Sequence, residues 1–209
     1  MDIIKKISQK VILSLVYLLV KEVKNDHYLP INQGFIVASN HASHIDPFVI
    51  TSIIYLKQRR IARYIGKEES LKNVIWRFIY KTFDVIPINR SSRSKKTIDY
   101  TIKCLNNKEI IGIFPEGTRT FDGRIQKGKT GIARIALQSK ACIVPVAIKG
   151  SFYIWPRHKK VPKFERTIIV NIGKVIDLHN YKKKKISKKT LRLITNLIMG
   201  RIEDLYVKI

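Results

Sequence analysis

The chain has 209 residues and carries 41 Lys and Arg against 15 Asp and Glu, which gives a formal net charge of +26. This length fits one ordinary domain with a short appendage. The charge indicates a negatively charged partner, but nucleic acid, an anionic membrane face and a phosphorylated substrate all fit it. The two cysteines, Cys104 and Cys142, exclude a disulfide framework and a zinc site of paired cysteines, and they favour a reducing cytosol.

The first predicted element is an N-terminal helix. An apolar run from Val11 to Val20, broken only by Ser14, follows three lysines. As a helix this run would be about 15 Å long, roughly half the hydrocarbon core of a bilayer, so it should not span a membrane. No small-residue cleavage site follows it, which argues against a signal peptide. We therefore expect residues 1–28 to be an amphipathic, apolar anchor that lies on the cytoplasmic face of a membrane, as in a peripheral or monotopic protein. The alternative is a helix packed on the domain's own core.

Residues 29–209 are expected to form the catalytic domain, and strand and helix patterns alternate along them. Strands are predicted at Phe35 to Ala38, Ile61 to Ile65, Val85 to Ile88, Ile110 to Phe114, Ile143 to Ile148 and Thr167 to Ile172. Helices are predicted at Pro47 to Leu56, Leu71 to Phe83, Lys95 to Leu105, Ile132 to Lys140 and, after a basic segment, Leu191 to Leu205. This alternation predicts an α/β fold with a mixed, largely parallel sheet that helices cover.

His41 and Asp46 are the first pair of residues able to do chemistry. On a regular helix a spacing of five places two side chains about 140° apart, so they can meet only on a turn. The sequence provides that turn, because the predicted strand ends near Ala38 and Pro47 marks the first turn of a helix. A carboxylate that orients an imidazole produces a general base able to deprotonate a hydroxyl. His44 is the rival base, without an obvious carboxylate partner, and Asp46 also suits an ordinary helix N-cap.

A polar turn follows the predicted strand that ends at Phe114. In open α/β sheets this edge is where ligands bind. Gly117 permits a close approach of the backbone, Thr118 offers a hydroxyl and Arg119 can bind a phosphate with two parallel hydrogen bonds. Arg90 ends another predicted strand and offers a second positive charge. The alternative is a turn in which Glu116 pairs with Arg119 and neither residue meets a ligand.

Two features point to other functions. Residues 123–130, GRIQKGKT, match the phosphate-loop pattern G-x-x-x-x-G-K-[ST]. That pattern requires a buried strand directly before it, and residues 118–122 do not form one, so we expect no nucleotide hydrolysis. The second feature is a basic, aromatic segment consisting of Tyr153, Trp155, Arg157, His158, Lys159 and Lys160. It suggests a nucleic-acid-binding protein, but no helix-turn-helix, zinc or RNA-recognition signature accompanies it.

Four blocks in order give a more specific indication. They are NHASHID at 40–46, IPINR at 86–90, FPEGTRT at 114–120 and VPV at 144–146. Together they resemble the glycerolipid acyltransferases, whose best-known members are the 1-acylglycerol-3-phosphate acyltransferases with an H-x₄-D motif. The resemblance runs from about Phe35 to Ile148. It implies that His41 is the base and Asp46 its orienting partner. It also implies phosphate-binding roles for Arg90, Glu116, Gly117 and Arg119, to which our interpretation of the turn adds Thr118.

The function implied by this resemblance is O-acyl transfer. A fatty acyl group would move from acyl-CoA or acyl-carrier protein to the sn-2 hydroxyl of 1-acylglycerol-3-phosphate, without an acyl-enzyme intermediate. Lyso-ornithine lipid, another lysophospholipid and glycerol-3-phosphate remain alternative acceptors. We expect no cofactor and no metal, with the acyl thioester as co-substrate. The expected partners are an anionic membrane surface, the lysophospholipid and the acyl donor, and no nucleic acid.

Overall fold

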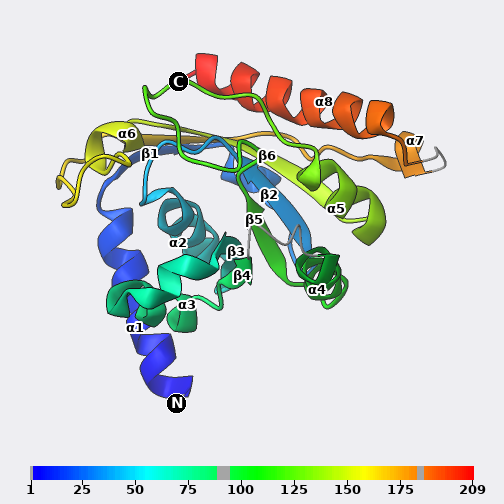
Figure 1. Cartoon of the computed structure of the whole chain (residues 1–209). Coiled ribbons are helices and arrows are strands. Elements are labelled where there is room, and N and C mark those ends of the chain that lie inside the picture. The colour runs from blue at the N-terminus through cyan, green and yellow to red at the C-terminus, as the bar shows by residue number, and fades with distance from the viewer. Residues whose placement is uncertain (1, 89–94, 183–185) are drawn as a thin grey trace.

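The computed structural model describes residues 2–88, 95–182 and 186–209 (Figure 1). Its helices are α1 (Asp2–Tyr17), η1 (Asp26–Tyr28), α2 (Asp46–Gln58), η2 (Glu68–Lys72), α3 (Val74–Thr82), α4 (Lys95–Asn106), α5 (Gly131–Ser139), α6 (Ser151–Ile154), α7 (His179–Lys182) and α8 (Lys188–Val207). Its strands are β1 (Val20–Lys24), β2 (Phe35–Ser39), β3 (Ala62–Lys67), β4 (Ile86–Ile88), β5 (Ile110–Ile113), β6 (Cys142–Lys149) and β7 (Ile168–Ile172).

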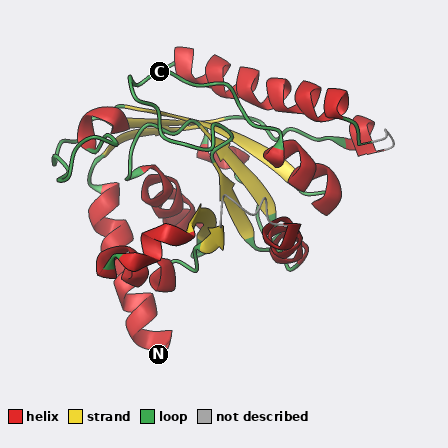
Figure 2. Cartoon of the chain, in the orientation of Figure 1, coloured by secondary structure: helices red, strands yellow, loops and turns green. Residues whose placement is uncertain are grey.

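The strands form one seven-stranded sheet in the order β1-β7-β6-β2-β5-β3-β4. Every neighbouring pair is parallel except β6 and β7, which are antiparallel. The mixed, largely parallel sheet predicted from the alternating pattern is therefore confirmed. Helices pack on both faces of this sheet (Figure 2).

Two buried apolar clusters fill the space between the sheet and its helices. Successive residues of β2 point to opposite faces, as the period of a strand requires. Phe35 and Val37 join the cluster that α1 and α2 cover, whereas Ile36 and Ala38 join the cluster that α4, α5 and α8 cover. Because both faces of β2 are buried, the strand consists of apolar residues without alternation. This layering holds the carboxyl ends of the central strands in fixed positions.

The central strands β2 and β5 are neighbours in parallel orientation. The chain leaves β2 toward α2 on one face and leaves β5 toward α5 on the other face. Such a reversal opens a crevice at the carboxyl ends of the strands, where open α/β folds bind ligands. The two polar segments singled out in the sequence follow these two strands directly.

The predicted boundary at residue 28 needs a correction. Residues 1–28 were expected to form a separate helical appendage, but α1 ends at Tyr17, and β1 pairs with β7 at the edge of the sheet. Lys21 and Glu22 are charged and exposed, so this strand lacks the apolar run by which a buried strand is predicted from the sequence. Within the described residues no helix has the length and apolar character needed to cross a membrane.

Candidate active site

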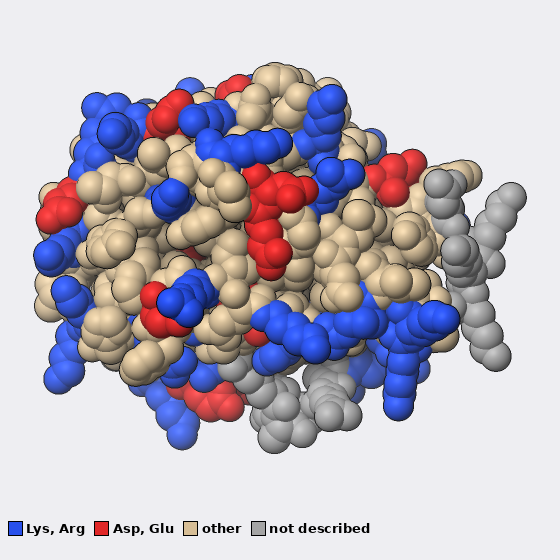
Figure 3. Space-filling model, turned by 90° about the horizontal axis from the view of Figure 1, so that it is seen from above, with Lys and Arg blue, Asp and Glu red and all other residues tan. Residues whose placement is uncertain are grey.

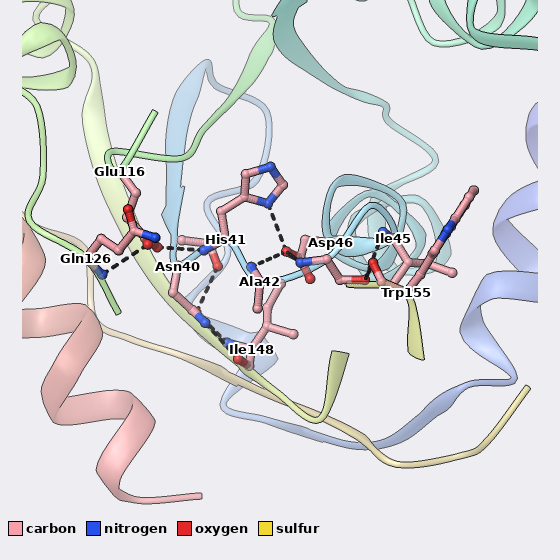
Figure 4. A network of polar contacts seen from close by, with 11 residues as sticks. Asn40, His41, Ala42, Ile45, Asp46, Glu116, Gln126, Ile148 and Trp155 are labelled. Atoms are coloured by element: carbon pink, nitrogen blue, oxygen red, sulfur yellow. Dashed lines mark hydrogen bonds and ion pairs between the residues drawn. The ribbon is translucent and has the colours of Figure 1, made fainter. Parts of the chain in front are cut away.

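The segment from Asn40 to Asp46 joins β2 to α2, and Asn40 fixes where it starts. The side-chain amide of Asn40 donates to the Ile148 carbonyl at 2.8 Å and accepts from the Ile148 amide at 2.8 Å. Both bonds reach across to β6, the strand beside β2. The Asn40 side chain thus makes the two hydrogen bonds that the main chain of a paired strand residue would make. It thereby fixes the next residue, His41, at the end of β2 (Figure 4).

Asp46 organises the loop before it. One carboxylate oxygen, Oδ2, accepts three hydrogen bonds: from His41 Nδ1 at 2.9 Å, from the Ala42 amide at 2.8 Å and from the Ser43 amide at 2.7 Å. Asp46 is the first residue of α2, and the N-cap position belongs to Ile45. The carboxylate thus holds the preceding turn together, which differs from the N-cap role considered above. Its side chain is fully buried, and Oδ1 has no hydrogen-bond partner in the described part of the chain.

His41 is held through its main chain as well as its ring. Its amide donates to Glu116 Oε1 at 2.7 Å, and its carbonyl accepts from the Thr120 amide at 2.8 Å. The imidazole stacks on the Phe114 ring with a centroid distance of 3.8 Å and an interplanar angle of 9°. A neutral His41 that donates its Nδ1 proton to Asp46 carries its lone pair on Nε2, which is the arrangement a general base needs.

The ring under His41 is itself supported. Phe114 stacks on Tyr64 at 5.3 Å, and Tyr64 lies opposite Gly112 in the pairing of β3 with β5. A Cβ on Gly112 would overlap the Tyr64 ring. Glycine at this position therefore makes room for the aromatic stack that ends at His41.

Changing Gly112 to Ala should destabilise the chain by about 1–3 kcal/mol, because the added methyl group overpacks the stack. Urea unfolding would measure this loss. The double variant Gly112→Ala with Tyr64→Leu should recover part of it, since leucine leaves the space that the methyl group needs. If the Gly112→Ala chain were as stable as the wild type, the Tyr64 ring would be able to move aside without loss of stability, and the expectation would be wrong.

Glu116 joins two loops. Its Oε1 accepts from the His41 amide and its Oε2 accepts from the Gln126 amide at 3.0 Å (Figure 4). Only 2% of the residue is exposed. Both oxygens of Glu116 therefore bind main-chain amides, so Glu116 holds the candidate turn in place and its carboxylate does not face a ligand. Arg119, the partner considered in the sequence, does not pair with it among the described ion pairs.

Burial raises the pKa of Glu116 from 4.5 to about 7, against the opposing effect of the amide hydrogen bonds from His41 and Gln126, while Asp46 adds to the rise. Between these two pKa values the folded chain keeps a proton that the unfolded chain has lost. Raising the pH through this window should therefore lower the free energy of unfolding, by up to about 3 kcal/mol relative to Glu116→Gln. Urea unfolding of both chains across the window measures the difference. Parallel pH profiles would contradict this expectation.

The turn after Glu116 is the candidate anion site. Gly117 has a φ of +72°, and the side chain of Lys129 packs where its Cβ would lie. Thr118 is partly exposed in the same turn.

Arg119 is partly buried, and its Nη1 is buried without a hydrogen-bond partner among the described residues. Burial lowers the pKa of the Arg119 guanidinium, nearby Arg157 lowers it further, and Asp46 opposes both. An anion at this position would supply the missing acceptor. Arg90, the other predicted phosphate ligand, lies outside the described residues.

The rings of His44, Trp76 and Trp155 form an aromatic group that the sequence did not indicate. The His44 ring lies 4.8 Å from the Trp155 ring and 5.6 Å from the Trp76 ring. The Trp155 carbonyl accepts from the Ser43 hydroxyl at 2.8 Å and from the His44 amide at 3.0 Å. Burial lowers the pKa of His44 to about 4, with Arg119 and His41 acting in the same direction and Asp46 against it. A weak base without a carboxylate partner in the described site makes His44 the poorer candidate for proton transfer.

The phosphate-loop match is not a nucleotide site in this structure. Its eight residues lie in an irregular segment, and the preceding strand, β5, ends at Ile113. Gly128 faces Thr195 and Met199 of α8 at a distance that leaves no room for a Cβ. The glycine therefore serves packing between the loop and α8, and the strand-to-loop geometry that cradles phosphates is missing.

At the carboxyl ends of β2 and β5, a histidine is thus held by a buried carboxylate, and a turn nearby carries a buried guanidinium nitrogen without a partner among the described residues. The acyltransferase family model matches residues 21–149, and the chain belongs to this family. The resemblance found in the four blocks is thus confirmed.

Named relatives agree with this assignment. The chain is 36% identical over 129 residues to a 1-acyl-sn-glycerol-3-phosphate acyltransferase of Bacillus subtilis (strain 168), an alignment that spans 62% of this chain and 62% of that protein. It is 32% identical over 127 residues to the protein of the same name from Limnanthes alba, which spans 57% of this chain and 42% of that protein. The chain thus spans less than two thirds of the length of these relatives.

The fold has a counterpart among solved structures. The crystal structure of the 1-acyl-sn-glycerophosphate (LPA) acyltransferase from Thermotoga maritima matches with a TM-score of 0.73 and 22% identity. The match covers 96% of this chain and 80% of that one. The similarity therefore extends beyond the family-model match to nearly the whole architecture described above.

Proposed function

We propose that the chain transfers a fatty acyl group from acyl-CoA or acyl-carrier protein to the sn-2 hydroxyl of 1-acylglycerol-3-phosphate, forming phosphatidate. The observation that carries this proposal is the pairing of the partly buried His41 with the fully buried Asp46 at 2.9 Å, beside the buried Nη1 of Arg119, which has no partner among the described residues. The pair suits the activation of a hydroxyl, and the guanidinium suits a phosphate on the same molecule. The names of the relatives point to the same acceptor.

In this mechanism Nε2 of His41 takes the proton of the acceptor hydroxyl as its oxygen attacks the thioester carbonyl carbon. Asp46 stabilises the imidazolium that forms, because its Oδ2 already accepts the Nδ1 proton. The tetrahedral intermediate then breaks its C–S bond, and the thiolate leaves with the proton from the imidazolium. The ester and the free thiol are the products, and no acyl-enzyme is needed.

Phosphate binding would position the acceptor for this step. A phosphate monoester carries two negative charges near neutral pH and matches the planar donors of a guanidinium. Gly117 and Thr118 would bring the main chain and a hydroxyl to the same anion, and the side chain of Lys129 lies against this turn. Other acceptors of the class remain alternatives, namely lyso-ornithine lipid, another lysophospholipid and glycerol-3-phosphate.

The outer face of α1 supports a location on a membrane surface, at its cytoplasmic side where thioester donors are available. One stripe of α1 is apolar and exposed, and it consists of Ile3, Ile4, Ile7, Val11 and Leu15, continued by Leu18 after the helix. The opposite face buries Leu13 and Val16 in the core. The helix therefore suits both roles considered from the sequence. One face packs on the core of the domain, and the other presents an apolar surface to lipid.

Positive side chains lie at many places on the face of the molecule that Figure 3 shows. Lys and Arg side chains outnumber the acidic side chains on this face, and some of them form a row at its lower right. A surface of this kind suits an anionic bilayer that many lysines meet at once.

The test is an assay of free thiol release. The full chain is incubated in anionic vesicles with acyl-CoA or acyl-carrier protein, and each candidate acceptor is added in turn. Thiol release that depends on 1-acylglycerol-3-phosphate, with phosphatidate as the product, supports the proposal. Dependence on another acceptor would assign that acceptor instead. Absence of acceptor-dependent release with both donors would overturn acyl transfer.

A further inference from the structure

The segment of residues 157–166, here called the basic loop, has no role in the reaction proposed above. It follows α6 and leads into β7, and it projects from the body of the molecule beside α6 in Figure 1. It carries five positive side chains and one acid, in the order Arg157, Lys159, Lys160, Lys163, Glu165 and Arg166, and all six are exposed. The loop is therefore a concentrated positive surface.

Two large apolar side chains lie among these charges. Val161 is 71% exposed and Phe164 is 82% exposed. A solvated loop gains nothing by presenting phenylalanine and valine between lysines. Apolar side chains interleaved with lysines are, in contrast, what the interface of an anionic bilayer accommodates, since the rings enter the headgroup boundary while the ammonium groups meet phosphates.

The basic loop has a defined conformation. The Trp155 indole donates to the Lys159 carbonyl at 3.1 Å, and the Lys159 amide donates to the Pro156 carbonyl at 3.1 Å. The Lys163 amide returns to the Ile154 carbonyl at 2.9 Å. These bonds close the loop on its own base, so Val161 and Phe164 are presented from a fixed support, which reduces the entropy lost on binding.

The base of the loop is joined to the end of the apolar stripe on α1. Arg166 donates from Nε to the Val20 carbonyl at 3.1 Å, and the Ile168 amide donates to the Leu19 carbonyl at 3.2 Å. Leu18, the last residue of the exposed stripe, directly precedes this junction. This continuity with an apolar surface favours a lipid bilayer as the partner over nucleic acid.

The other end of the loop reaches the catalytic segment. Trp155 lies two residues before the loop, and its carbonyl accepts hydrogen bonds from the Ser43 hydroxyl and the His44 amide. Arg157 lies over the Phe121 ring at 5.9 Å and lowers the pKa of Arg119. Because the loop contacts the segment that carries the candidate phosphate site, a membrane that binds the loop would lie close to that site.

We propose that the basic loop docks on an anionic membrane surface and thereby places the His41 site at that surface. The loop inserts Phe164 and Val161 between headgroups, and its lysines contact the phosphates. Membrane binding is independent of the acyl-transfer reaction, whereas the placement of the site rests on the proposed function.

The experiment measures sedimentation of the full chain with vesicles. The variant Lys159→Ala/Lys160→Ala/Lys163→Ala/Phe164→Ser is compared with wild type on neutral phosphatidylcholine and on phosphatidylcholine mixed with phosphatidylglycerol. The partition coefficient on the anionic vesicles should fall about 10- to 100-fold. The control Lys174→Ala/Lys188→Ala/Lys189→Ala removes equal charge from exposed positions elsewhere and should lower it less than about threefold.

Thermal unfolding of each variant should show that the fold is retained, because every substituted side chain is exposed. Equal binding of the loop variant and the control to anionic vesicles would overturn the proposal. So would a loop variant that loses affinity for duplex DNA while keeping its affinity for vesicles, since nucleic acid would then be the partner. The binding result holds whether or not thiol release is detected, so failure of this inference is distinct from failure of the acyl-transfer proposal.

Discussion

Replacing His41 by Ala should lower kcat for acyl transfer about 10²- to 10⁴-fold, the usual contribution of a positioned general base. The imidazole is the one titratable ring in the described site that a buried carboxylate orients, through the 2.9 Å bond to Asp46. Removing it deletes the proton acceptor but leaves the main-chain bonds of residue 41 to Glu116 and Thr120 in place. The loss should therefore appear in kcat, with little change in the KM of either substrate.

Two further variants separate chemistry from structure. Asp46→Asn keeps an oxygen for the amides of Ala42 and Ser43 but removes the charge that stabilises an imidazolium, so activity should fall while the fold persists. His27→Ala changes an exposed histidine outside the site and should leave kcat within about twofold. If His44→Ala abolished activity and His41→Ala kept it, the assignment of the base would be reversed.

Replacing Arg119 by Ala should lower kcat/KM for 1-acylglycerol-3-phosphate about 10²-fold, as expected when one partner of a partly buried charged pair is removed. The reason is the buried Nη1, which lacks a partner among the described residues and gains one when a phosphate binds. The change should be concentrated in the KM of the acceptor. The KM of the thioester donor should remain within about threefold, because the guanidinium is assigned to the phosphate of the acceptor.

Arg124→Ala is the matched control for this experiment. Arg124 lies in the same segment between β5 and α5, and its largely exposed guanidinium makes a loose 3.8 Å ion pair with Asp122. Its loss should change neither KM beyond experimental scatter. A similar rise in the KM of the acceptor for both arginine variants would indicate a general effect of charge, and the specific phosphate site would have to be abandoned.

The central sheet was predictable because its strands are buried on both faces. Runs such as Phe35 to Ala38 and Ile143 to Ile148 stand out as continuous apolar segments bounded by polar ones. The edge strand β1 was not predictable, because the exposed Lys21 and Glu22 break its apolar pattern and its pairing partner β7 lies far along the chain. The one-turn helices α6 and α7 are too short to show a helical period.

The pair of His41 and Asp46 was predictable because both residues lie within one short turn that Pro47 limits. The remaining parts of the site depend on contacts between distant residues. Nothing in the sequence near Glu116 indicates that its second oxygen accepts from Gln126, and nothing near Ser43 indicates the Trp155 carbonyl. The stacking of Phe114 on His41 follows from the pairing of β2 with β5, which a local pattern does not specify.

The two hydrogen bonds between Asn40 and Ile148 also bear on how the chain folds. They join residues 108 positions apart, and the Trp155 carbonyl reaches Ser43 across 112 positions. Long-range contacts of this kind form late, because closing the intervening loop costs chain entropy before any contact stabilises it. During synthesis the catalytic turn therefore remains incomplete until β6 and α6 have left the ribosome. A nascent chain that ends before β6 can build β2 to β5, but it lacks the Ile148 main chain that binds Asn40 and the Trp155 carbonyl that accepts from Ser43 and His44.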